Sequence, residues 1–240
     1  YFAFTRKAAK EARERMPIDD KKLEHFQTLH SFAYNTLGLN EENIMQPFHY
    51  EDLGKELGIR VKYSDKYNDE ETHFLTCNDP YFQMIGRAIN RDVSIREEFD
   101  RNEHDRKQIR WSTLKHIYDN FLKYKKNYRL NDFNDIINNV LNKVPEFDVV
   151  FIDEAQDLSP LQWKLYDKLK EKSKDVYLAG DDDQAIFAWA GADVSRFIKE
   201  SAKEKILNKS KRISKMVQEE SKKPIERISG IRKQKDYLAR

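Results

Sequence analysis

Two acidic clusters have the residue types and spacing of a site that binds a metal ion and a phosphate. Asp153 and Glu154 follow the apolar run FDVVFI, and Asp181 to Gln184 follow the run DVYLAG. Mg²⁺ takes oxygen ligands and usually keeps waters and substrate phosphates around it. One carboxylate can hold such an ion while its neighbour orients or deprotonates an attacking water. The alternative is that these residues, with Asp157, only cap the next helix; a strand-like run leading straight into DEAQD favours the chemical interpretation.

The second acidic cluster runs directly into an aromatic segment, IFAWAG, which contains Phe187 and Trp189. Without further context, ordinary core packing would be the default interpretation of both rings. Their position beside a predicted phosphate-facing edge instead favours rings that stack on nucleic-acid bases. Such stacking contributes about 1–3 kcal/mol per base and tolerates any base sequence.

The residues around these clusters predict a parallel α/β sheet. FDVVFI is a continuous β-branched and aromatic run, which is typical of a strand buried on both faces. SPLQWKLYDKLKEK predicts a helix with Ser159 as N-cap, Pro160 in the first position and Gln162 completing a capping box. DVYLAG predicts the next strand. A strand, a helix and a strand with short connections indicate parallel strands covered by helices.

The beginning of the sequence predicts another strand of the same sheet. YFAFT is a short apolar run, and RKAAKEARERM is rich in helix formers and stops at Pro17. HFQTLHSFAYNTLG predicts an extended start and then a helix closed by Gly38. Because ligands bind outside the carboxyl ends of the strands in such sheets, we expect Thr5 and Arg6 to share one edge with the two acidic clusters.

Residues 39 to 116 have a different character, with dense charges and few strand-like runs. The segment 96–126 predicts helix throughout, so we expect a mostly helical insertion. LNDFNDIINNVLNKV predicts a further amphipathic helix. Its apolar face carries Phe133, Ile136, Ile137, Val140 and Leu141.

Composition limits the classes of protein. The 240 residues are 39% hydrophobic and 36% charged, and Cys77 is the only cysteine, which indicates a globular chain without a disulfide framework and fits a reducing compartment. No apolar run reaches membrane-spanning length, and the scattered histidines lack zinc-ligand spacing. The net charge is only +2, but residues 199–240 hold fourteen Lys and Arg against six Asp and Glu. That basic end could bind a phosphate backbone or be a solvated tail.

Several segments, in a fixed order, resemble motifs of the UvrD/Rep-type superfamily 1 DNA helicases. FIDEAQD resembles the Walker B segment (motif II) and GDDDQAIFAWAGA resembles motif III. FAFTRKAAKEARER is similar to motif Ia, and FQTLHSF to motif Ib. YKKNYRLNDFNDII is similar to the segment before motif II, and LNKSKRIS more weakly to motif IV. The resemblance implies a RecA-like P-loop NTPase fold, in which helices flank a parallel sheet and a mostly helical subdomain is inserted.

The resemblance also implies roles for single residues. Asp153 would ligate Mg²⁺, Glu154 would activate the hydrolytic water, and Gln184 would sense the γ-phosphate of ATP. Asp181 would border the nucleotide, and Arg212 in motif IV would reach ATP from a second motor domain. The implied DNA track consists of Phe4, Thr5, Arg6, Thr28, His30, Phe187 and Trp189. From the sequence alone, a surface or capping role for His30 stays open.

The implied protein is an ATP-dependent helicase or translocase that uses ATP and Mg²⁺ and moves 3′ to 5′ on single-stranded DNA. Residues 1–38 and 117–207 would form the first motor domain, 39–116 its helical insertion, and 208–240 the start of a second motor domain. Its partners would be single-stranded DNA, single-strand/duplex junctions and accessory repair or replication proteins, with no membrane. Its place would be the cytoplasm and nucleoid of a bacterial or phage-infected cell.

The sequence departs from the family in two respects. The phosphate-binding loop GxxxxGK[ST] is absent, since Gly54-Lys55 is followed by Glu56 and lacks the upstream glycine. Without that lysine and amide cradle the phosphates lose their main anchor, so we expect the chain alone neither to hydrolyse ATP well nor to unwind DNA. Ala190 stands where relatives commonly carry arginine, which puts one DNA contact or domain-coupling contact in doubt.

Three hypotheses follow from these departures. The leading one is an incomplete helicase chain, which also lacks motifs V and VI. The second is a non-catalytic remnant that binds single-stranded DNA. A helicase–nuclease is the third, and it would need a nuclease domain that nothing in this sequence supplies.

Overall fold

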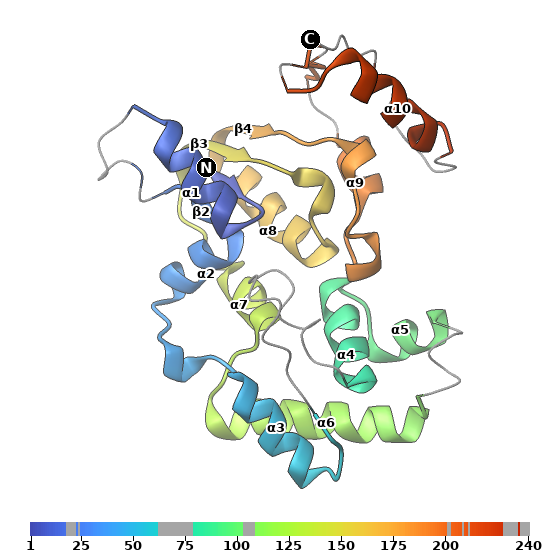
Figure 1. The fold of residues 1–240 in the computed structure, drawn as a ribbon. Coiled ribbons are helices and arrows are strands. Elements are labelled where there is room, and N and C mark those ends of the chain that lie inside the picture. The colour runs from blue at the N-terminus through green and yellow to red at the C-terminus, as the bar shows by residue number, and fades with distance from the viewer. Residues whose placement is uncertain are drawn as a thin grey trace.

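A computed structural model describes residues 1–17, 23, 25–61, 79–102, 109–200, 203–207, 209–210, 212–227 and 235, without the side chain of Trp189. Within this part the chain forms two lobes, each with its own hydrophobic core. In Figure 1 the sheet lobe lies above and the helical lobe, with α3 and α6, lies below. Cys77 lies outside the described residues.

The upper lobe is built on a four-stranded parallel sheet in the order β2-β1-β3-β4. The strands are β1 (Phe2–Ala3), β2 (Gln27–Thr28), β3 (Phe147–Ile152) and β4 (Ser173–Leu178). β3 and β4 pair along their whole length, from Phe147 opposite Ser173 to Ile152 opposite Leu178. The predicted parallel sheet is confirmed, and its parallel strands bring all the carboxyl ends to one edge.

Helices cover this sheet, as the sequence predicts. α1 (Arg6–Arg15) joins β1 to β2, and α8 (Pro160–Glu171) joins β3 to β4. α2 (Leu29–Leu37) and α7 (Phe133–Val140) pack against one another, and α9 (Val194–Lys199) follows the sheet. The Ser159–Gln162 capping box at the start of α8 is confirmed, and Gly38, with φ of 64°, closes α2.

The strand β3 is buried on one face only, so the prediction of burial on both faces is wrong. Val150 and Ile152 are 1% and 2% exposed and pack under α8, whereas Val149 and Phe151 are 44% and 47% exposed. The ring of Phe151 stacks on that of Tyr177, with centroids 4.8 Å apart. Right-handed crossovers put α1 and α8 on opposite faces, but α1 contacts β1 and β2 rather than β3. The run is apolar at every position from Val149 to Ile152, so these four residues do not reveal which face is covered.

The lower lobe is helical. It contains α3 (Pro47–Glu56), α4 (Pro80–Asn90), α5 (Ile95–Arg101) and α6 (Trp111–Tyr128), which pack around a core that includes Leu53, Met84, Ile85 and Phe121. The unbroken helix predicted over 96–126 is wrong. α5 ends at Arg101, where the side chain of Asn102 donates to the carbonyl of Glu98 (2.9 Å). Such side-chain bonds to the backbone compete with helix continuation.

The boundary expected at residue 116 falls inside α6. Leu114 and Ile117, on either side of it, are 0% and 1% exposed and belong to the same lower core. The lobes meet at the C-terminal end of this helix. There the ammonium of buried Lys125 contacts the carboxylates of Asp132 and Asp135. A buried lysine between two carboxylates fixes the end of α6 against the start of α7.

The C-terminal part contributes α10 (Lys215–Ile225), which Figure 1 shows beyond α9. Four short 3₁₀ turns complete the described structure: Glu41–Asn43, Ala155–Asp157, Asp182–Gln184 and Ala188–Ala190. None of the helices in the described ranges has the length and apolar character to span a bilayer.

Candidate functional site

Asp153 and Glu154 lie at the carboxyl edge of the sheet, directly after β3. The N–H of Asp153 donates to the carbonyl of Phe2 (2.9 Å), which fixes it beside the end of β1. Its carboxylate accepts from the hydroxyl of Tyr1 (2.6 Å) and from the N–H of Glu154 (3.0 Å). Burial and the bond to Asp153 raise the pKa of the Tyr1 hydroxyl, so it stays protonated and acts as a donor.

Glu154 adopts a left-handed backbone conformation, with φ of 54°. This region is uncommon for residues other than glycine, and such strain persists where the surrounding structure enforces it. The turn at Glu154 sends the chain from β3 into the 3₁₀ turn Ala155–Asp157.

The buried amide of Gln156 joins the two acidic clusters. Its Nε2 donates to Oε2 of Glu154 (2.8 Å) and to Oδ2 of Asp157 (3.1 Å). Its Oε1 accepts from the N–H of Asp181 (2.9 Å), at the start of the second cluster. Gln156 is only 1% exposed. Sequence reasoning did not single out Gln156, although an amide between acidic residues in DEAQD was a visible signal.

Gly180 leaves room for the contact between the side chain of Gln156 and the N–H of Asp181. A Cβ atom there would lie 2.5 Å from Oε1 of Gln156 and 2.9 Å from Cζ of Phe197. Both distances are shorter than normal contacts, so a side chain at residue 180 would force Gln156 and Phe197 to move.

The second acidic cluster forms a tight turn. Asp181 accepts from the N–H of Asp183 (3.2 Å) and from Nε2 of Gln184 (2.6 Å), while Gln184 stays exposed. The ammonium of Lys235 pairs with Asp181 and Asp182 and lies 3.6 Å from Asp183. Burial alone would raise the pKa of Asp181, but the bonds from Lys235 and Gln184 outweigh it and lower that pKa. The turn is therefore negatively charged and ordered.

The donor set suits Mg²⁺ held jointly with a nucleotide rather than by protein alone. No group of three or more His, Cys, Asp and Glu side chains in the described ranges could hold a metal ion. Mg²⁺ needs only one or two carboxylates when phosphates and waters complete its shell. Asp153 offers such a carboxylate at the sheet edge, so the residues present fit that ion.

The aromatic half of the site pairs residues from distant segments. The ring centroids of Phe4 and Phe187 lie 5.3 Å apart at 43°, and both rings are half-buried. Both line a small cavity together with His30, Phe133 and Asn134. The two predicted DNA-contacting rings are thus neighbours, whereas the Trp189 side chain lies outside the described residues.

The other residues predicted along the DNA track have structural contacts. Thr5 caps α1 by accepting from the N–H of Ala8 (3.0 Å), and Thr28 caps α2 by accepting from that of Ser31 (3.1 Å). Thr28 is 2% exposed, which favours a role in placing its neighbours over direct contact with a strand. His30 is 7% exposed and stacks on Phe133, with centroids 4.0 Å apart.

Arg6 and Arg212, the basic residues predicted to contact DNA and ATP, take no part in the contacts described for Thr5, Thr28 and His30. Arg6 is exposed at the start of α1 and lines a larger cavity between the lobes. Arg212 is exposed, and its N–H donates to Oγ of Ser210 (3.2 Å). Among the described residues Arg212 makes no ion pair with the acidic clusters.

Asp157 makes the stability of the folded protein depend on pH. It is 8% exposed, and within the described chain its Oδ1 has no hydrogen-bond partner. Burial and the charge of Glu154 raise its pKa from 3.8 to about 6, against the opposing effect of the bond from Gln156. The folded protein therefore holds this proton more tightly than the unfolded chain, and the stability from Asp157 falls as pH rises from about 4 to 6.

We predict that Asp157→Asn raises the melting temperature at pH 8, because it removes a buried charge and keeps an acceptor for Gln156. A gain of about 2–4 °C is expected, which corresponds to about 1 kcal/mol for a chain of this length. The gain should shrink at pH 5. Asp148→Asn is the control, since Lys174 lowers the pKa of that exposed carboxyl and its loss should give no gain. Equal melting temperatures for Asp157→Asn and the unaltered chain at pH 8 would contradict this account.

Comparisons with known proteins agree with the geometry. Residues 1–205 match the UvrD/REP helicase N-terminal domain family. A probable DNA helicase of Mycoplasma pneumoniae is 30% identical over 82% of this chain and 40% of its own length. The DNA helicase II of Haemophilus influenzae is 27% identical over 85% of this chain and 30% of its own length.

A shorter match supports the same assignment. A probable DNA helicase II homolog of Mycoplasma genitalium is 36% identical over 101 residues. The chain spans between 14% and 40% of the length of these three relatives. The matched range contains both lobes, both acidic clusters and the pair of Phe4 and Phe187. The chain therefore belongs to the UvrD/REP helicase N-terminal domain family.

Proposed function

We propose that this chain is part of the motor of an ATP-dependent DNA helicase that moves along single-stranded DNA in the 3′ to 5′ direction. The observation that carries the proposal is the buried amide of Gln156, which joins Glu154 to the backbone of Asp181. The segment that begins at Asp181 continues to Phe187 within a few residues. One hydrogen-bonded unit therefore combines groups suited to a nucleotide with groups suited to a nucleic acid.

In the nucleotide half, Asp153 would hold Mg²⁺ and Glu154 would orient and deprotonate the attacking water. Mg²⁺, when bound, would neutralise charge on the phosphates of ATP. Gln184 would face the γ-phosphate, because its amide is exposed and its Nε2 is fixed by a hydrogen bond to the carboxylate of Asp181. Arg212 would contact the nucleotide only after the segment 208–240 and the first motor domain close on it.

In the DNA half, we propose that Phe4, Phe187 and Trp189 provide the stacking surface. Half-buried rings keep a fixed orientation and still present a face, so little side-chain entropy is lost on binding. Arg6 would contact the backbone of the strand, while Thr5, Thr28 and His30 would hold the ends of α1 and α2 in place.

A short stretch of backbone would couple the nucleotide half to the DNA half. A change at the γ-phosphate would act on Gln184 and Asp181, and the backbone from Ala185 to Phe187 would pass it to the stacking pair. Asn90 in α4 donates to the carbonyl of Ala190 (3.2 Å), so the same movement would reach the helical lobe.

The domain division follows the two cores. We propose that the helical insertion covers residues 39–130 rather than 39–116, since α6 packs in the lower core up to Tyr124. Residues 1–38 and 131–207 would then form the first motor domain, and 208–240 would begin the next one. A motor of this kind would act on single strands and junctions in the cytoplasm and nucleoid, together with repair or replication proteins.

Phe187→Leu tests the DNA half. The change keeps apolar bulk and removes the stacking face, so affinity for a fluorescein-labelled thymidine oligonucleotide should fall by about 1–3 kcal/mol. Fluorescence anisotropy at fixed salt measures this affinity. Phe48→Leu is the matched control, because Phe48 is 56% exposed on α3 in the other lobe. Equal affinities for both variants and the unaltered chain would reject the stacking role.

Glu154→Gln tests the nucleotide half, in a full-length helicase that carries this domain. The amide keeps an acceptor for Gln156 but cannot take a proton, so DNA-stimulated ATP turnover should fall about 10²–10⁴-fold. Affinity for the oligonucleotide should stay the same. Glu146→Gln, an exposed change just before β3, should leave turnover unchanged. Normal turnover in Glu154→Gln would remove Glu154 from the proposed chemistry.

A further inference from the structure

The hydroxyl of Tyr1 reaches the carboxylate of Asp153, which lies 152 positions further along the chain. Oη of Tyr1 donates to Oδ2 of Asp153, and the two atoms are 2.6 Å apart. The backbone N–H of Asp153 donates to the carbonyl of Phe2, the next residue after Tyr1. The segment that begins β1 therefore holds both the backbone and the side chain of Asp153. None of the roles proposed above uses Tyr1.

The side chain of Tyr1 has a firm support. Its ring stacks on that of Phe26, with centroids 5.2 Å apart at 27°. Its carbonyl accepts from the N–H of Gln27 (3.1 Å), and its backbone nitrogen donates to the carbonyl of His25 (3.1 Å). A ring fixed in this way loses little further entropy when its hydroxyl forms a hydrogen bond. The hydroxyl of Tyr1 is therefore a donor with a fixed position.

Two donors from different segments set the orientation of the Asp153 carboxylate. Oδ2 accepts from Tyr1, and Oδ1 accepts from the N–H of Glu154 (3.0 Å). The last side-chain torsion of an aspartate is broad, so a carboxylate with one donor can still rotate. A carboxylate has about four acceptor sites, so two donors leave room for a cation or a water. The bond from Tyr1 thus decides which acceptor sites Asp153 offers to a ligand.

The fold does not depend on this hydrogen bond. Backbone contacts already join β1 to β3, since Phe2 pairs with Ile152 and accepts from the N–H of Asp153. Tyr1 and Asp153 are both half-buried, so water can replace either partner. Partners that orient a metal-binding side chain have a larger effect, because their loss lowers metal affinity about 10- to 100-fold.

We propose that Tyr1 is a positioning residue, whose hydroxyl orients the carboxylate of Asp153 toward the divalent cation that accompanies the nucleotide. The proposal rests on the function proposed above, since it needs Asp153 as the residue that holds Mg²⁺. Tyr1 acts through Asp153 and needs no contact with the ion or with the nucleotide.

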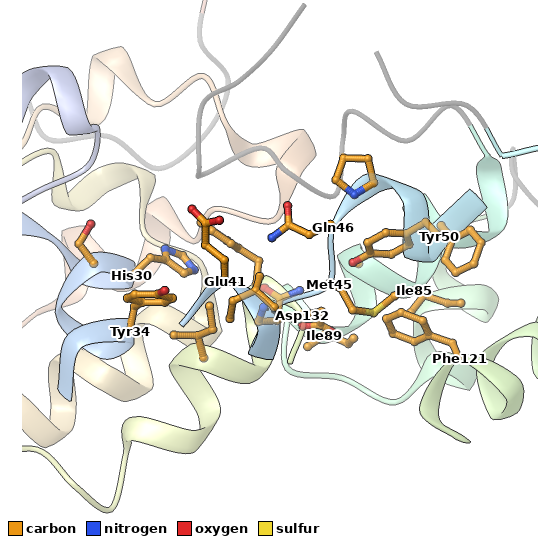
Figure 2. A pocket seen from close by; sticks show the side chains of 18 of the residues that line it. His30, Tyr34, Glu41, Met45, Gln46, Tyr50, Ile85, Ile89, Phe121 and Asp132 are labelled. Carbon is orange, nitrogen blue, oxygen red and sulfur yellow. Dashed lines mark hydrogen bonds between the residues drawn. The ribbon is translucent and has the colours of Figure 1, made fainter. Parts of the chain in front are cut away.

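Tyr1 lies apart from the surfaces proposed for DNA. The larger cavity between the lobes, of about 490 Å³, has His30 at one end and Phe121 at the other (Figure 2). Tyr1 lines neither this cavity nor the small one that holds Phe4 and Phe187. Loss of its hydroxyl should therefore weaken binding of the metal ion and leave the affinity for an oligonucleotide unchanged.

The test uses a full-length helicase that carries this domain, with Mn²⁺ in place of Mg²⁺ and with ADP present. Electron paramagnetic resonance measures the Mn²⁺ that the protein binds, without any turnover of ATP. Tyr1→Phe keeps the ring and removes the hydroxyl, so affinity for Mn²⁺ should fall about 10- to 100-fold. Affinity for ADP in the presence of EDTA should stay the same. Tyr177→Phe is the matched control, since Tyr177 is 54% exposed on β4, and should alter neither affinity.

A double-mutant cycle separates positioning from a general effect on the fold. If the hydroxyl acts through Asp153, adding Tyr1→Phe to Asp153→Asn should cause no further loss of Mn²⁺ affinity. An equal loss in both backgrounds would overturn the proposal. Phe26→Leu gives a second variant if Tyr1→Phe fails to fold in circular dichroism. It keeps the hydroxyl but removes the support of the ring, so Mn²⁺ affinity should also fall; no change would count against the proposal.

Failure of this proposal is distinguishable from failure of the proposed function. If Asp153→Asn weakens Mn²⁺ binding but Tyr1→Phe behaves as Tyr177→Phe does, Tyr1 has no positioning role and the proposed function stands. If Asp153→Asn binds Mn²⁺ as tightly as the unaltered protein, the role proposed for Asp153 fails and that of Tyr1 fails with it.

Discussion

The amide of Gln156 is the interaction on which the rest of the site depends. It is buried at the edge of the sheet, and its three hydrogen bonds reach Glu154, Asp157 and the backbone of Asp181. A buried amide must have all its bonds satisfied, so its partners cannot move independently without cost. Gly180 keeps the space for it, and the left-handed turn at Glu154 presents the carboxylate to it.

The same edge gathers parts of the chain that are far apart in sequence. Parallel pairing of β1 with β3 places Asp153 beside Phe2, and the ring of Phe4 reaches that of Phe187. Several contacts attach the helical lobe to the sheet lobe, and two of them come from side chains of the helical lobe. Lys125 binds the start of α7, and Asn90 binds the carbonyl of Ala190. Under the proposed function, such contacts would carry a shift at the nucleotide half to the helical lobe.

Much of this arrangement could be predicted from the sequence. The capping box at Ser159 and the apolar runs of β3 and β4 are local signals, and they predict the parallel sheet and the shared edge. The burial of one face of β3 could not be predicted, because Val149 and Phe151 are as apolar as Val150. The break after α5 was also missed, since the bond from Asn102 back to Glu98 competes with helix in a segment of strong helix formers.

The site was predicted as a set of residues but not as a connected unit. Motif resemblance supplied Asp153, Glu154, Gln184 and Phe187, whereas the role proposed for Gln156 follows only from its burial and its hydrogen-bond partners. A buried polar residue inside a motif leaves no periodic signal in a single sequence. Thr28 shows the reverse case, since the resemblance implies a DNA contact, whereas its hydroxyl caps α2.

Affinity for single-stranded DNA in the variant Gln156→Met tests the central claim most directly. Methionine has similar length and volume but makes none of the three hydrogen bonds, and residue 156 is too deeply buried to touch a strand. We expect faster hydrogen exchange at the amides from Asp181 to Gln184 and weaker binding of the oligonucleotide, in a chain that still unfolds cooperatively. Unchanged exchange and unchanged affinity in that folded variant would contradict a linked nucleotide and DNA site.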